Sequence, residues 1–197
     1  MTLSSLATNR LLPVYVNNGL TYLGNWANVT AVTGTPTTGT YTDSTGTYKY
    51  WQWTGAGSIT TTLGAIDTLV VGGGPGRNTN LTYSGSSTAG ALATRGIIIA
   101  TAATHTISVG GAGGNSSAAL TANESRGGGS SLGSLASVAA SSPENPSNDR
   151  QFNSSITGTS VLYCPSSNNA YYGGGGNSTS GGSGVVIVRV PSINNLT

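Results

Sequence analysis

Apolar and polar residues alternate with a period of two along much of the chain after residue 40. Segment 48–53 alternates in this way and places Trp51 and Trp53 on one face, and segment 59–63 repeats the pattern after a glycine-containing turn at 55–57. Such alternation is the pattern of a half-buried β-strand, and two strands joined by a short turn are typical of a hairpin. Segments 48–53 and 59–63 are therefore predicted to pair.

Later strands are indicated by apolar runs that are rich in β-branched residues. Segment 67–71 is mostly apolar, 96–100 contains three successive isoleucines, and 185–190 is β-branched at five of six positions. Segment 104–109 alternates, and it is predicted to pair with 96–100. Because no helical period runs for more than two turns after residue 40, the predicted fold class is all-β, a small antiparallel β-sandwich.

Glycine is concentrated in short clusters that directly adjoin these strands. Glycine costs backbone entropy on folding, so a chain keeps it where backbones approach closely or where φ is positive. We therefore expect glycine-rich ordered loops, either tight turns or packed segments of polyproline II type, in place of a flexible linker. The clusters are residues 72–76, 110–114, 127–129, 173–176 and 181–184.

The strand pattern divides the chain into an N-terminal arm, a β domain and a tail. Residues 1–38 are predicted to be a separate attachment arm, closed by a Thr-, Gly- and Pro-rich linker or set of turns at 32–40. Residues 39–191 form the predicted glycine-rich β domain, and residues 192–197 form a short C-terminal tail. In the arm, four leucines are expected in one short helix ended by Pro13 or in a packed extended segment. These four leucines are Leu3, Leu6, Leu11 and Leu12.

A polar segment at 141–172 interrupts the β domain and is predicted to be a long surface insertion without strands. It contains three prolines and a group of tyrosines and asparagines. Loops on a rigid scaffold commonly carry binding residues, and these side chains suit stacking on a sugar and bonding its hydroxyls. Alternatively, the tyrosines pack beneath the loop and order it. The candidates for receptor contact are Tyr163, Asn168, Asn169, Tyr171 and Tyr172.

The composition restricts the class of protein further. Serine, threonine, glycine and asparagine supply 104 of the 197 residues, and only 6% of residues are charged, against about 25% in ordinary soluble domains. The single lysine excludes a helical bundle, and a net charge of +2 excludes a charge-solvated disordered tail. The arginines are scattered, and no apolar run approaches the roughly 20 residues of a membrane span. Neither nucleic acid nor a membrane is therefore an expected partner.

Motifs for catalysis and cofactor binding are incomplete. Segment 69–77 is similar to a dinucleotide fingerprint, but Arg77 replaces the third glycine and no helical period follows. The only histidine, His105, lies on an apolar strand face and is expected to pack there. Cys164, the only cysteine, is expected to be half-buried and inert, with a bridge between two copies as the alternative. One histidine and one cysteine make no zinc site, so we expect no metal, no cofactor and no enzymatic activity.

Six motifs in order resemble the glycine-rich domain of bacteriophage tail fibres and related virion proteins. In that family an aromatic hairpin precedes a strand ending in V-V-G-G-G-x-G, and the domain closes with a strand of the form G-G-S-G-V-V-I-V-R. The resemblance covers about residues 40–190. The matching stretches are Trp53–Gly57, Leu69–Gly76, Ile107–Gly114, Gly128–Gly133, Gly173–Gly176 and Gly181–Val190.

This resemblance implies a non-enzymatic virion protein, namely a tail-fibre or receptor-binding adhesin subunit attached through its N-terminus. The candidates for docking to the virion are then the four leucines of the arm, Leu3, Leu6, Leu11 and Leu12. Its expected partners are other tail or capsid proteins, a host surface glycan and further copies of itself. Fibrous phage proteins are usually homotrimers, and a trimer would cover the exposed sheet edges. A capsid decoration or head-fibre protein is the alternative in the same class, and a nucleotide-binding oxidoreductase is the alternative from a different class.

Overall fold

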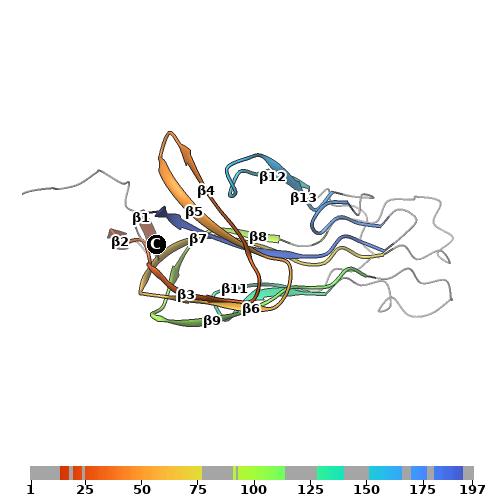
Figure 1. The fold of residues 1–197 in the computed structure, drawn as a ribbon, viewed down its shortest axis with the longest axis horizontal. Coiled ribbons are helices and arrows are strands. Elements are labelled where there is room, and N and C mark those ends of the chain that lie inside the picture. The colour runs from red at the N-terminus through yellow and green to blue at the C-terminus, as the bar shows by residue number, and fades with distance from the viewer. Residues whose placement is uncertain are drawn as a thin grey trace, which may run out of the picture.

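Two five-stranded antiparallel sheets pack face to face, which confirms the predicted all-β antiparallel sandwich (Figure 1). The computed structural model describes residues 14–17, 20–23, 25–76, 91, 93–113, 128–139, 151–165, 170–176 and 180–192. Sheet I contains, in spatial order, β4 (Thr37–Asp43), β5 (Gly46–Trp53), β14 (Val185–Pro191), β7 (Gly64–Val71) and β8 (Ala93–Ala100). Sheet II contains β11 (Ala136–Val138), β10 (Ser130–Leu132), β9 (Ala103–Ser108), β6 (Gly57–Thr61) and β3 (Val29–Thr33).

Two hairpins accompany the sheets. One pairs β1 (Val14–Asn17) with β2 (Leu20–Leu23), and the other pairs β12 (Phe152–Ser154) with β13 (Val161–Tyr163). The β12–β13 hairpin lies over sheet I, on the side away from sheet II (Figure 1). Sheet I is therefore the middle of three layers, with apolar clusters on both of its faces.

The main core lies between the two sheets and follows the alternation of the strands. Trp51 and Trp53 are 4% and 1% exposed, as their shared face predicts, and the Trp53 indole donates a 3.0 Å hydrogen bond to the Thr33 carbonyl. This bond satisfies the polar atom of a buried aromatic ring. The other fully enclosed large side chains of this cluster include Ile59, Ile66, Ile107 and Leu132.

A second apolar cluster lies between sheet I and the β12–β13 hairpin. It buries Leu69, Val71, Val185 and Ile187 from the sheet against Tyr163 from the hairpin. Strands β7 and β14 thus carry apolar side chains on both faces, which explains why their sequences read as nearly continuous apolar runs. The hairpin also corrects the interpretation of residues 141–172 as a loop without strands.

Strand pairing differs from both predicted pairs. Strands β5 and β6 lie in opposite sheets, where β5 pairs with β4 and β14, and β6 pairs with β3 and β9. Strands β8 and β9 also lie in opposite sheets, and β8 pairs with β7. The hairpins predicted for 48–63 and 96–109 are therefore wrong. Alternation specifies which face of a strand is buried but not which strand lies beside it, and both connections lead from one sheet to the other.

The boundary predicted at residue 38 also changes. Strand β3 pairs with β6, Ala27 and Val29 are buried in the main core, and β4 begins at Thr37. Residues 25–38 therefore belong to the sandwich, and the predicted linker at 32–40 is largely strand. Threonine is favoured in strands as well as in turns, which explains the error. The four leucines proposed for docking, Leu3, Leu6, Leu11 and Leu12, lie outside the described residues.

The glycine clusters are ordered and pack together as one unit, which we call the glycine bundle. Its segments continue from the strand ends at one end of the sandwich (Figure 1), and backbone hydrogen bonds join them. The Gly73 amide donates to the Gly128 carbonyl (2.8 Å), and the Gly74 amide donates to the Gly182 carbonyl (2.7 Å). The bundle comprises residues 72–76, 110–113, 128–129, 173–176 and 181–184.

Close backbone approach explains why these positions are glycine. A Cβ atom added to Gly73 would lie 2.0 Å from the Gly111 carbonyl oxygen, and one added to Gly110 would lie 2.0 Å from the Gly128 carbonyl oxygen. No side chain fits at such distances. The prediction of ordered glycine segments is therefore confirmed for the described part of each cluster.

Candidate functional site

The predicted receptor-contact residues are not brought together on one surface. Tyr163 is 1% exposed and stacks between Phe152 and Tyr172, with ring centres 5.5 and 6.3 Å away. Tyr172 is half-buried, and its hydroxyl accepts a 2.8 Å hydrogen bond from the Gln52 side chain. Tyr171 is 39% exposed. Asn168 and Asn169 lie outside the described residues, so contact with a receptor stays a prediction for these two and for Tyr171, and packing accounts for Tyr163 and Tyr172.

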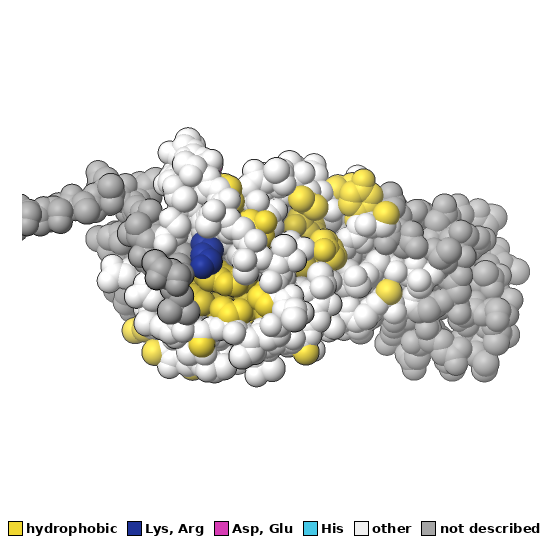
Figure 2. Space-filling view, in the orientation of Figure 1, with side chains coloured by type: hydrophobic (Ala, Val, Ile, Leu, Met, Phe, Trp, Pro, Cys, Tyr) yellow, Lys and Arg dark blue, Asp and Glu magenta, His cyan; other side chains and the backbone are white. Residues whose placement is uncertain are grey.

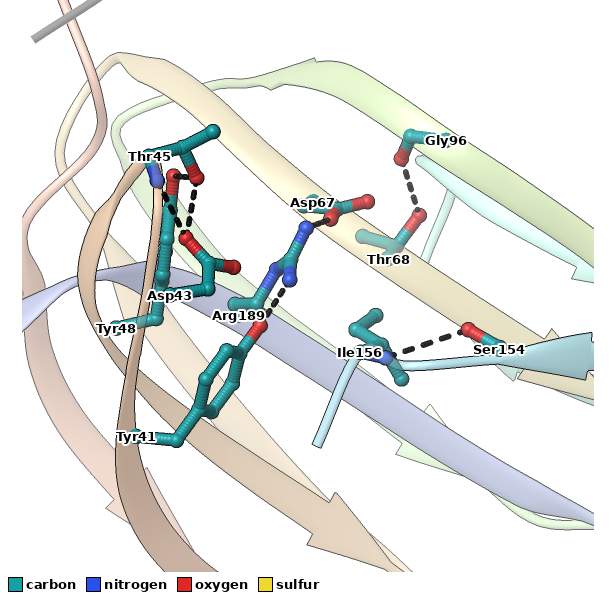
Figure 3. Close-up of polar contacts among 10 residues, drawn as sticks. All are labelled: Tyr41, Asp43, Thr45, Tyr48, Asp67, Thr68, Gly96, Ser154, Ile156 and Arg189. Carbon is teal, nitrogen blue, oxygen red and sulfur yellow. Dashed lines mark hydrogen bonds and ion pairs between the residues drawn. The ribbon is translucent and has the colours of Figure 1, made fainter. Parts of the chain in front are cut away.

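A polar groove on the outer side of sheet I brings more polar side chains together than the predicted tyrosine surface does (Figure 3). Its volume is about 670 Å³, within the range of roughly 300–1,000 Å³ typical of small-molecule sites. Strands β4, β7, β8 and β14 supply one wall, and the β12–β13 hairpin supplies the other. The lining residues are Tyr41, Asp43, Asp67, Thr68, Arg95, Gly96, Ser154, Ser155, Ile156, Gly158 and Arg189.

Charge is concentrated in this groove. The described part of the chain contains five Asp, Glu, Lys or Arg residues, and all except Lys49 line the groove. The face in Figure 2, in contrast, shows one small basic area and no acidic area among the described residues. Among the described residues, two carboxylates and two guanidinium groups therefore lie side by side in this groove, and Lys49 is the charged residue that lies outside it.

The Arg189 guanidinium is the centre of the groove. It forms an ion pair with Asp67 and donates a hydrogen bond to the Tyr41 hydroxyl (Figure 3). Its central carbon also lies 4.7 Å from the ring centre of Tyr48, which is close enough for a cation–π interaction. The Arg189 Nε atom is buried and has no hydrogen-bond partner among the described residues. The charge of Arg189 is therefore balanced by Asp67, but not all of its N–H groups are hydrogen-bonded to described residues.

The other two charged residues are exposed at the rim of the groove. Asp43 accepts hydrogen bonds from the Thr45 amide (2.8 Å) and hydroxyl (2.6 Å) in the β4–β5 turn. The Arg95 guanidinium lies 4.5 Å from the ring centre of Phe152 and makes a long contact of 3.5 Å with the Asn153 carbonyl. These contacts orient both groups while leaving donors and acceptors accessible to a ligand.

The surroundings shift the pKa of three groups in the groove. Burial raises the pKa of the Tyr41 hydroxyl, so Tyr41 stays protonated at neutral pH. The hydrogen bonds from Thr45 lower the pKa of Asp43. Burial alone would lower the pKa of Arg189, but the Asp67 carboxylate and the Tyr41 hydroxyl hold it above its usual value. Asp43 and Arg189 thus carry opposite charges at neutral pH.

The sequence contains a signal for this groove that pattern reasoning missed. Asp67 and Arg189 are each the only charged residue in a strand that is otherwise apolar or small. A charge in a buried strand requires a partner, and here two such charges of opposite sign are direct neighbours across the β7–β14 pair. Treating Arg189 as one of several scattered arginines concealed this relationship.

The structure also shows where the only histidine and the only cysteine lie. His105 is 5% exposed, and its Nε2 atom lies 3.2 Å from both the Thr61 hydroxyl and the Thr101 carbonyl, so it packs as predicted. Cys164 is fully buried, which is more than predicted. The described residues contain no group of three metal-ligating side chains and no helix long and apolar enough to cross a membrane.

The chain was compared with family models, curated proteins and solved structures, and nothing matched. The candidate function therefore depends on the residues of this chain and on their arrangement.

One prediction concerns Tyr163, which anchors the hairpin wall of the groove. Burial raises the pKa of Tyr163 to about 12, whereas an unfolded tyrosine ionises near pH 10. A raised folded-state pKa gives stability that is complete below pH 10 and is lost as the pH rises through 12, an amount of about 2–3 kcal/mol. Urea unfolding on either side of this window should show a steeper loss in the native protein than in a Tyr163→Phe variant. Equal losses would contradict the assignment.

Proposed function

We propose that the chain is a non-enzymatic structural subunit of a bacteriophage virion, a tail-fibre or receptor-binding adhesin protein that attaches through its N-terminal residues. The observation that carries the proposal is the glycine bundle. Its segments are the stretches that resemble the glycine-rich domain of phage tail fibres, and in this chain they pack as one ordered extension of an all-β sandwich. The contacts formed by this packing offset the backbone entropy that the glycines lose on folding.

The surface properties support a role within a larger assembly. A chain with 6% charged residues is poorly protected against association. Strand β8 is an edge of sheet I, and it carries Ile97 and Ile99 on its outward face at 42% and 37% exposure. Exposed apolar edge strands favour pairing with other chains. We propose that such edges are covered by other copies in a homotrimer or by neighbouring virion proteins.

The nucleotide-binding alternative is disfavoured by the hydrogen bonds of the glycine segment after β7. A dinucleotide site needs amides there that point at the pyrophosphate. The amides of Gly73 and Gly74 donate instead to carbonyls of the glycine bundle.

The proposal is tested on particles of the phage that encodes the chain. Antibody–gold labelling should place the protein on the tail, whereas labelling on the head would indicate a capsid decoration or head-fibre protein. Absence of the protein from purified particles would overturn the proposal.

Deletion of residues 2–24 is expected to leave a folded domain that no longer enters particles. The cut lies before Ala27 and Val29, so the main core and β3 are retained and the melting temperature should change little. Deletion to residue 38 would remove β3 and is not a clean test. A variant that lacks residues 193–197 is the matched control and should be incorporated. Normal incorporation of the 2–24 deletion would show that the attachment site lies elsewhere.

A further inference from the structure

The charged residues of the groove on the outer side of sheet I are not all explained by their contribution to the stability of the fold. An exposed ion pair or lone surface charge contributes little to stability, typically below about 1 kcal/mol. Asp43 and Arg95 are exposed, so neither is needed to hold the fold together. Yet these two residues line one cavity together with the Arg189–Asp67 pair, and Lys49 is the one charged residue of the described part that lies elsewhere. The gathering of four of the five described charged residues around one cavity points to a ligand.

The pattern of charges restricts the ligand. Two carboxylates and two guanidinium groups give the groove a formal charge of zero with both signs represented. An anion would be repelled by Asp43 and Asp67 as well as attracted by Arg95 and Arg189. The reverse holds for a cation, so the groove offers no net attraction to a ligand of either charge. A neutral ligand that can donate hydrogen bonds to the carboxylates and accept them from the guanidinium groups matches the charges of both signs.

Hydroxyl groups have this double capacity, because each one both donates and accepts. Neighbouring hydroxyls on one sugar ring can therefore bond a carboxylate and a guanidinium at the same time. Ser154 and Ser155 line the same groove, and the Ser154 hydroxyl accepts a 3.4 Å hydrogen bond from the Ile156 amide. Tyr41 also lines the groove, and its ring is held by stacking on that of Tyr48, with centres 5.7 Å apart. Tyr41 thus adds aromatic surface of the kind that packs against the C–H face of a sugar.

We infer that this groove is a binding site for a neutral saccharide. Asp43 accepts hydrogen bonds from ligand hydroxyls, Arg95 donates to their oxygens, and the Arg189–Asp67 pair forms the polar floor between them. The inference deepens the proposed function and rests on it for the source of the ligand, a glycan on the host surface. The site lies on the sandwich and is separate from the tyrosines that sequence reasoning proposed for receptor contact.

The test uses the full chain and saturation-transfer NMR. The probes are the methyl glycosides of glucose, galactose, mannose and N-acetylglucosamine, with N-acetylneuraminic acid and phosphocholine as the acidic and zwitterionic comparisons. At least one neutral glycoside should receive saturation. Asp43→Asn and Arg95→Gln should each weaken its binding roughly tenfold or more, because each removes a hydrogen bond to a charged group. Lys49→Gln, which removes the one described charged side chain outside the groove, is the matched control and should bind normally.

Both groove variants replace exposed side chains, so their melting temperatures should match that of the native protein. The inference would be overturned if none of the neutral glycosides received saturation, or if an acidic or zwitterionic probe bound more strongly than they do. It would also be overturned if Lys49→Gln weakened glycoside binding as much as the groove variants do. These outcomes are distinct from failure of the proposed function, which is decided by the presence and position of the protein on particles. A chain that binds a glycoside but is absent from particles would retain the site and lose the phage assignment.

Discussion

Replacing Gly74 with alanine is expected to lower the free energy of unfolding by about 3 kcal/mol or more. A Cβ atom at this position would lie 1.9 Å from the Gly174 carbonyl oxygen and 2.6 Å from its carbon. Both atoms belong to the backbone, so relief requires two segments of the glycine bundle to separate. Separation would also break the 2.7 Å hydrogen bond from the Gly74 amide to the Gly182 carbonyl. Chemical denaturation of the purified variant measures the loss.

Gly111→Ala provides the matched control within the same bundle. No atom lies within 4 Å of a Cβ built on Gly111, and its backbone is not in the left-handed region. Alanine there should leave stability unchanged or raise it by about 0.4–1 kcal/mol, because it restricts the unfolded chain. Equal stability of the two variants would show that the glycine bundle is not the tightly packed unit described above.

Replacing Tyr163 with alanine is expected to destabilise the protein by about 3–5 kcal/mol, the usual result of truncating a fully buried aromatic side chain. Tyr163 contacts the outer face of sheet I and stacks on Phe152 and Tyr172. Its removal leaves a cavity beneath the hairpin that forms one wall of the charged groove. The unfolding midpoint in urea and the binding of the methyl glycosides should therefore both decrease.

Tyr171→Ala is the control for this effect. Tyr171 is a nearby tyrosine in the chain, but its side chain is 39% exposed, so the change in stability should stay within about 0.5 kcal/mol. If the Tyr163 variant were as stable as the Tyr171 variant, the hairpin would not be anchored as the second apolar cluster indicates. If Tyr171→Ala alone abolished attachment to host cells without loss of stability, Tyr171 would be a receptor contact.

Several features of the fold follow from local properties of the chain and were predictable. The alternation in 48–53 identifies the buried face that contains Trp51 and Trp53, and the β-branched run at 185–190 identifies a strand. Glycine clusters next to strands indicated ordered close packing, since their entropic cost needs compensation. His105 was correctly predicted to pack on its strand. Each of these conclusions requires only a residue type and its immediate neighbours.

Strand partners and the charged groove were decided by tertiary structure. The local pattern of residue types was enough to predict the all-β class, the buried faces and the positions of the glycine segments. It did not determine that β5 and β6 lie in opposite sheets, because a period of two specifies a face but no neighbour. Asp67 and Arg189 are 122 residues apart in the chain and meet only because β7 pairs with β14. Proximity between such distant residues arises from sheet topology, and the groove with its balanced charges exists only once that topology has formed.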